Sequence, residues 1–139
     1  MAHGIFREKA EKRGFKIHIE SSGTSGFHVG EHADPRSIST LRSKGIDIMD
    51  LRSRKFTSAD FNDYDFIFTM DQQNQNDVLK MAEIANSPNK PEMIMNVSYP
   101  GENISVPDPY YGGATGFEDV YQMLDKALDK LLEQIEDQN

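Results

Sequence analysis

Cysteine is absent from the 139-residue chain, and this absence limits its chemistry more than any other feature of the composition. Without cysteine the sequence holds no disulfide, no thiolate metal site and no cysteine nucleophile. Long apolar runs are missing too: none approaches the ~20 residues that span a bilayer, so no membrane association is expected. No signal peptide precedes the first polar helix, which predicts a cytoplasmic protein.

Positive charge is scarce as well. The chain has 15 Lys and Arg residues against 23 Asp and Glu residues, a formal net charge of −8. An acidic balance of this kind predicts neither nucleic acid nor an anionic membrane as a partner. The length predicts a single domain, 1–139, that is long enough to bury a hydrophobic core.

The apolar residues that are present alternate between strand-like and helix-like runs. Short alternating or continuous apolar runs predict strands over 15–20, 64–70 and 92–97. Helical spacing, with capping residues at the ends, predicts helices over 1–13, from Asp34 to just before Gly45, from Asp71 to Ala85 and over 116–136. Strands that alternate with helices predict an α/β fold with a parallel sheet and right-handed crossovers.

Loops that follow parallel strands share one face of the sheet, and ligands bind on that face. The loops concerned are 21–26, the helix start at Asp71, and 106–113. The first of them is small and polar. It is either an anion site built from backbone N–H groups or a plain connection.

The loop Pro107–Gly113 carries the most chemistry. It places Asp108 between two prolines, follows it with Tyr110 and Tyr111, and ends in two glycines. The prolines restrict the backbone on both sides of the carboxylate, and the glycines let the chain turn away from it. This combination predicts a surface that holds an aromatic or anionic substrate next to a proton donor. A turn capped by Asp108 is the alternative, and the residue types leave both readings open.

The segment Asp50–Lys55 is basic in a chain that is otherwise acidic. This local reversal of charge suits an anionic ligand or partner. A turn whose charges face only water is the other interpretation.

Several stretches, taken in order, resemble the low-molecular-weight protein tyrosine phosphatases. The resemblance covers nearly the whole chain with compatible spacing, and the stretches together are highly specific. They are Met1–Phe6, Ser21–Gly30, Ala33–Ser37, Phe68–Asp71 and Asp108–Gly112. The resemblance implies a three-layer α/β/α sandwich with a short parallel sheet, in which the first strand of the family is missing.

The family also implies a reaction, in which a thiolate attacks phosphorus and water then hydrolyses the phosphocysteine. By resemblance, Asp108 is the general acid that protonates the leaving phenolate and afterwards activates the water. Tyr110, Tyr111 and Phe27 are the walls that stack on the ring of a phosphotyrosine protein substrate, and His28, beside Phe27, helps to set substrate choice. The family implies no metal and no cofactor.

The family's nucleophile lies in a loop of the form Cys-x-x-x-x-x-Arg-Ser-Pro, immediately before the helix that Met1–Phe6 matches. That loop and its strand are absent here, so the chain as given is expected to be inactive. Two explanations are open: a start codon assigned to an internal Met of a longer active enzyme, or a truncation. In the family the missing strand lies between those matching 16–20 and 66–70. We therefore expect the unpaired edges of the strands 16–20 and 66–70 to pair again, either directly with each other or by self-association with a second copy.

Three other functions are considered beside the phosphatase. A non-catalytic module would bind a phosphorylated or regulatory partner, with Arg52–Lys55 as the anion contact. An arsenate reductase of similar architecture would need further cysteines in a mobile loop, and 74–89 has none. A flavodoxin-like FMN binder would open a helix directly after its phosphate loop, whereas 27–33 separates Ser22–Gly26 from the next predicted helix.

Overall fold

The computed structural model describes residues 1–25 and 29–138. Its elements in chain order are α1 (Ala2–Lys12), α2 (Pro35–Ser43), α3 (Asp60–Asp63), β1 (Phe68–Thr69), α4 (Gln72–Ile84), β2 (Glu92–Met93), the 3-10 turns η1 (Ile94–Asn96), η2 (Pro109–Tyr111) and η3 (Gly113–Thr115), and α5 (Gly116–Asp137).

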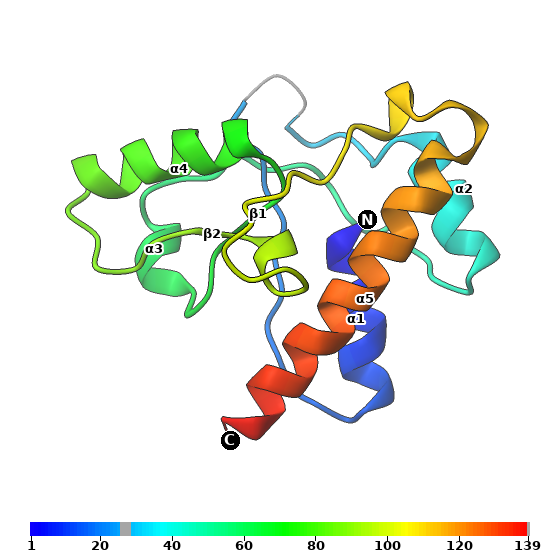
Figure 1. The fold of residues 1–139 in the computed structure, drawn as a ribbon, viewed down its shortest axis with the longest axis horizontal. Coiled ribbons are helices and arrows are strands. Elements are labelled where there is room, and N and C mark those ends of the chain that lie inside the picture. The colour runs from blue at the N-terminus through cyan, green and yellow to red at the C-terminus, as the bar shows by residue number, and fades with distance from the viewer. Residues whose placement is uncertain (26–28, 139) are drawn as a thin grey trace.

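The helices lie on both sides of a short parallel sheet. β1 pairs with β2 in the register Phe68 to Glu92 and Thr69 to Met93. Figure 1 shows α3 and α4 on one side of these strands and α1, α2 and α5 on the other. The predicted α/β fold with a short parallel sheet is confirmed.

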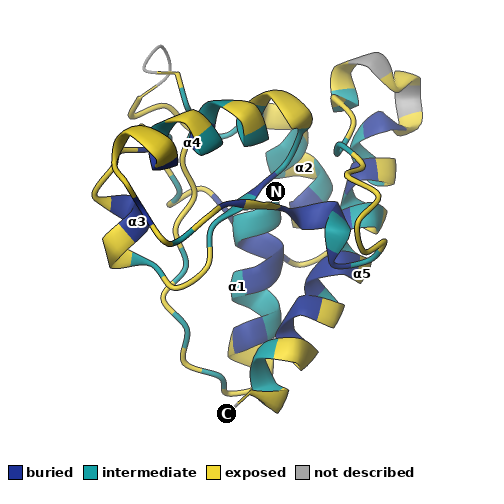
Figure 2. Ribbon diagram, turned by 60° about the vertical axis from the view of Figure 1, so that its left-hand side comes forward, coloured by how far each residue is buried: buried dark blue, intermediate teal, exposed yellow. Residues whose placement is uncertain are grey.

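The larger hydrophobic core is built around α5. On the apolar face predicted for this helix, Val120, Leu124, Leu128 and Leu131 are buried, and Phe117, Tyr121 and Ile135 are half-buried. Leu132 is wholly inaccessible. α1 packs against the same helix (Figure 2), and the Lys9 Nζ lies 2.8 Å from an Asp125 oxygen and 2.7 Å from an Asp129 oxygen. Burial alone would lower the pKa of Lys9, but its hydrogen bonds to these two carboxylates together have the larger effect. The pKa of Lys9 is therefore raised. These contacts hold the first and last helices together as one layer.

The predicted helix ends are confirmed where a capping residue sets them. The Asp34 carboxylate accepts a hydrogen bond from the Arg36 N–H at 2.7 Å, with Pro35 in the first turn of α2. The Asp71 carboxylate accepts from the Asn74 N–H at 2.7 Å and so caps α4. Side-chain oxygens of this kind satisfy N–H groups that have no partner within the helix.

The predicted strands are largely wrong in extent. Residues 15–20 are extended and their burial alternates, but they form no strand because no described segment pairs with them. The run 64–70 was expected to be covered on both faces, yet only 68–69 are paired and Phe66 is 52% exposed. The run 92–97 is a strand only over its first two residues. The chain then turns into η1 and buries Ile94 and Met95.

Direct re-pairing of the two edges is contradicted. Among residues 1–25 and 29–138, β1 pairs only with β2, and 16–20 do not pair with 66–70. Re-pairing through a second copy stays a prediction. No helix in the described part of the chain is long and apolar enough to cross a membrane.

Candidate active site

The loop that carries Asp108 follows β2 and η1 in the chain and lies beside the carboxyl end of β1. The Val106 N–H donates to the Met70 carbonyl at 2.8 Å, and the Gln72 N–H donates to the Ser105 Oγ at 3.0 Å. These bonds join the loop to the start of α4. The prediction that 106–113 and the helix start at 71 share one face is therefore confirmed.

Asp108 caps the short turn η2. Its Oδ1 accepts a hydrogen bond from the Tyr110 N–H at 2.9 Å, and the side chain is exposed. Its Oδ2 makes no hydrogen bond to another described residue. The capped turn considered from the sequence is thus present, and it leaves one carboxylate oxygen open to a ligand.

Two glycines allow this loop to lie directly on the start of α5. A Cβ on Gly112 would stand 2.7 Å from the Gly116 Cα, and a Cβ on Gly116 would stand 3.1 Å from the Pro109 carbonyl carbon and closer still to its oxygen. Real Cβ atoms essentially never approach within 3.0 Å. Side chains at these positions would push the loop away from the helix, so the pair of glycines sets where Asp108 stands.

Tyr110 is held between α2 and α5. Its hydroxyl donates a hydrogen bond to the Asp34 carboxylate, and the Arg36 guanidinium lies 4.1 Å from its ring centroid. Its ring meets the Phe117 ring edge-on, with the centroids 5.8 Å apart. Arg36, Tyr110 and Phe117 border a cavity of about 350 Å³. From the sequence, Asp34 and Arg36 are predicted only as a helix start, and their contacts with Tyr110 are not predicted. Tyr111 lies in η2 beside Tyr110, and the position of its side chain is not described.

Residues 21–25, the described part of the loop predicted on the same face, reach the side of α4. The Thr24 hydroxyl donates to an Asp77 carboxylate oxygen at 3.5 Å. Phe27 and His28, the other predicted substrate-binding residues, lie outside the described residues.

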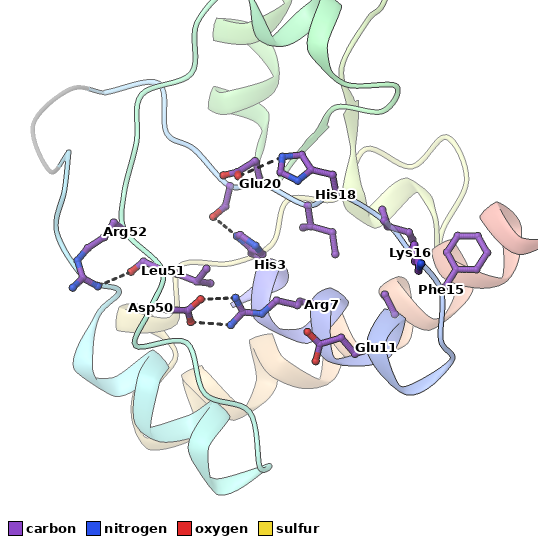
Figure 3. Close-up of a pocket in the computed structure, with 14 residues that line it drawn as sticks. His3, Arg7, Glu11, Phe15, Lys16, His18, Glu20, Asp50, Leu51 and Arg52 are labelled. Carbon is purple, nitrogen blue, oxygen red and sulfur yellow. Dashed lines mark hydrogen bonds and ion pairs between the residues drawn. The ribbon is translucent and has the colours of Figure 1, made fainter.

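A larger groove of about 800 Å³ runs beside α1 and residues 15–21 (Figure 3). Within it the His3 Nδ1 and the Ser21 Oγ are 2.8 Å apart, and Arg7 makes a bidentate contact with Asp50 at 2.7 and 3.0 Å. Burial, followed by the nearby charge of Arg7, lowers the pKa of His3. The hydrogen bond from Arg7 lowers the pKa of Asp50. Neither pair is predicted from the sequence, because the members of each pair are far apart along the chain.

The basic segment 50–55 is not a free anion site. The Arg54 guanidinium forms two hydrogen bonds of 3.1 Å with Asp60, and Arg52 Nη1 lies 2.7 Å from both His32 Nδ1 and the Met49 carbonyl. The guanidinium groups are thus used within the protein. Across the described part of the chain, no group of three or more His, Asp or Glu side chains is placed to hold a metal ion.

Known proteins resemble this chain over most of its length. A family model for low molecular weight phosphotyrosine protein phosphatases matches residues 1–139. A low molecular weight phosphotyrosine protein phosphatase of Schizosaccharomyces pombe is 37% identical over 127 residues, which cover 89% of this chain and 80% of the relative. The low molecular weight protein-tyrosine-phosphatase YfkJ of Bacillus subtilis is 33% identical over 138 residues, covering 98% of this chain and 86% of the relative.

Solved structures give the same result. The crystal structure of YfkJ superposes with a TM-score of 0.88 at 31% identity, covering 99% of this chain and 86% of that one. A protein tyrosine phosphatase of Entamoeba histolytica, with Hepes in its active site, has a TM-score of 0.84 at 28% identity and covers 98% of this chain and 87% of its own. Since the match extends over the whole chain rather than over one motif, this protein belongs to the low molecular weight phosphotyrosine protein phosphatase family.

Proposed function

We propose that this chain carries the acid and aromatic half of a protein tyrosine phosphatase site, in which Asp108 donates a proton to a leaving phenolate. The state of its carboxylate supports the proposal. One oxygen accepts the Tyr110 N–H at 2.9 Å, which fixes the carboxyl plane, and the other is exposed without a partner among the described residues. A group held by one oxygen and open at the other is suited to transferring a proton.

The proposed substrate is the phosphotyrosine side chain of a protein. Tyr110 would provide a fixed wall, because Asp34 holds its hydroxyl and Arg36 covers one face of its ring. We propose Tyr111, Phe27 and His28 as the other walls. A ring that stacks on such walls gains roughly 0.5–1.5 kcal/mol beyond the area it buries.

The nucleophile is not among these residues, because the 139-residue chain has no cysteine. We propose that the chain alone does not turn over aryl phosphates. It should hydrolyse p-nitrophenyl phosphate no faster than buffer, and Asp108→Asn should change nothing. Clear turnover by this chain that Asp108→Asn abolishes would contradict the proposal.

The role of Asp108 is tested by placing a segment with Cys-x-x-x-x-x-Arg-Ser-Pro in front of Met1. In that enzyme Asp108→Asn should slow hydrolysis of p-nitrophenyl phosphate by about 10²–10⁴-fold, the usual contribution of a general acid, and leave inorganic phosphate binding unchanged. Asp65→Asn, at an exposed acid outside the loop, is the control and should have no effect. Equal losses in the two variants would remove Asp108 from the reaction.

A further inference from the structure

Tyr110 connects the carboxylate of Asp108 to the start of α2. Its backbone N–H donates to the Asp108 Oδ1 at 2.9 Å, and its hydroxyl donates to the Asp34 carboxylate. The two ends of one residue are therefore bonded to two carboxylates, one in the loop and one at the start of a helix. A movement of the Tyr110 side chain away from Asp34 would also displace the N–H that fixes the plane of the Asp108 carboxyl group.

Contacts rather than burial hold Tyr110 in place, because this residue is 53% exposed. The Arg36 guanidinium covers one face of its ring, and the Phe117 ring meets it edge-on. Aromatic pairs tolerate centroid separations of about 4.5–7 Å. A hydrogen bond to a carboxylate is more directional and roughly twice as strong as a bond between neutral groups. The bond to Asp34 therefore sets where the hydroxyl end of Tyr110 lies.

Asp34 is itself fixed by the helix that it begins. Its Oδ1 accepts the Arg36 N–H at 2.7 Å and caps α2, while its Oδ2 accepts the Tyr110 hydroxyl. α2 is anchored in the larger hydrophobic core through Leu41, which is wholly inaccessible, and α5 packs beside it (Figure 1). One carboxylate thus caps a helix and holds the loop, so the loop is positioned relative to a rigid element.

We propose that Asp34 is a positioning residue for proton transfer by Asp108 and acts through Tyr110; this rests on the proposed role of Asp108 as general acid. A general acid must lie within about 2.6–3.2 Å of the atom that it protonates. A displacement of about 1 Å, caused by a change far from the reacting atoms, can cost roughly 10²-fold in rate. Without the bond to Asp34, Asp108 is still present but occupies the productive position less often. Asp34 itself needs no contact with the substrate.

Two substitutions break this contact in different ways. Tyr110→Phe removes the hydroxyl and keeps the ring. Asp34→Ser keeps an oxygen that caps α2, because serine is as good an N-cap as aspartate, but that single oxygen leaves none for Tyr110. The control is Tyr99→Phe, which removes a hydroxyl outside the loop from a tyrosine of similar exposure, 49%.

The contact can be measured in the 139-residue chain by NMR hydrogen exchange. The amide at position 110 should exchange about two- to tenfold faster in Tyr110→Phe and in Asp34→Ser than in the parent, the range that the loss of one hydrogen bond gives. The double variant should exchange no faster than either single variant, because both changes remove the same contact. Tyr99→Phe should leave the amide unchanged. Unchanged exchange in both single variants would overturn the proposal.

Proton transfer is measured in the enzyme that carries the Cys-x-x-x-x-x-Arg-Ser-Pro segment in front of Met1. Phenolate needs a proton more than p-nitrophenolate does, because phenol is the weaker acid. Tyr110→Phe and Asp34→Ser should therefore lower kcat/KM about tenfold for phenyl phosphate and less for p-nitrophenyl phosphate, and leave binding of inorganic phosphate unchanged. A general loss of structure would instead lower both rates equally and weaken phosphate binding.

Asp108→Asn in the same enzyme separates this proposal from the proposed function. If Asp108→Asn slows phenyl phosphate hydrolysis while Asp34→Ser and Tyr110→Phe do not, Asp108 is the acid but Asp34 does not position it. Equal losses on the two substrates in Asp34→Ser would also remove the positioning role. If Asp108→Asn has no effect on either substrate, the proposed function itself fails, and the role of Asp34 fails with it.

Discussion

Replacing Gly116 with alanine probes the contact that sets the position of the Asp108 loop. Gly116 begins α5 with helical dihedral angles, φ −55° and ψ −46°, so alanine is compatible with the backbone. On helix propensity alone Gly116→Ala would stabilise the protein by up to about 0.5–1 kcal/mol. The close contact between Gly116 and Pro109 of the Asp108 loop opposes this gain.

The magnitude follows from what the new methyl group meets. It would fall on the carbonyl group of Pro109, 3.1 Å from the carbon and 3.4 Å from the Pro109 Cα. These are backbone atoms of η2, which cannot move without shifting Asp108 and Tyr110. Overpacking of this kind costs about 1–3 kcal/mol. The difference between this cost and the gain in propensity is about 0–2.5 kcal/mol. Since the methyl group meets backbone atoms rather than a flexible side chain, Gly116→Ala should destabilise the protein by about 1–2 kcal/mol.

Thermal and urea unfolding measure this effect. The melting temperature should fall by about 3–8 °C, and the urea midpoint should fall while the m-value stays constant. Gln134→Ala, at an exposed position of the same helix, is the control and should change stability by less than about 0.5 kcal/mol. If Gly116→Ala is more stable than the parent, helix propensity alone acts there, and the loop does not rest on α5.

Three further predictions concern other parts of the chain. Arg54→Leu should lower the free energy of unfolding, measured in urea, by about 2 kcal/mol, because it leaves the Asp60 carboxylate without its bidentate partner. Asp60 is 5% exposed, but the Arg54 side chain is 34% exposed. The cost therefore stays below the ~3–5 kcal/mol of a fully buried pair. Arg42→Leu, at an exposed arginine, should cost almost nothing, and equal losses would refute the role of the Asp60 pair. Burial lowers the pKa of His3, so the folded state binds a proton less readily than the unfolded state. The stability of the fold should therefore fall as the pH drops below 6.5, the ordinary pKa of histidine. This loss of stability should be smaller in His3→Gln. Leu132→Ala, at a fully buried position, should cost about 2–5 kcal/mol in the same unfolding assay, and a loss below about 1 kcal/mol would contradict the packing of α5.

The helix boundaries could be predicted from the sequence because the interactions that set them are local. Asp34 and Asp71 bond to N–H groups two and three residues ahead. Gly45 ends α2 with a φ of +80°, a conformation that other residues rarely adopt. The apolar face of α5 repeats at helical spacing, so its burial follows from periodicity alone.

The strands could not be predicted in the same way, because a strand requires a partner from elsewhere in the chain. Residues 15–20 have the alternation of a strand but no paired neighbour in the described chain, and Phe66 lies in an apolar run without being covered. A hydrophobic pattern states which side chains favour burial. It does not state which backbone will supply the hydrogen bonds.

The same distinction between local and tertiary interactions applies to the candidate site. The sequence by itself determined that Asp108 follows a proline, caps a turn and precedes two phenols, since these are relations between neighbours. Only the tertiary structure decided that Tyr110 is held by Asp34, 76 residues away, and covered by Arg36. That arrangement depends on α2 and α5 packing side by side around the loop, which no local interaction along the chain encodes.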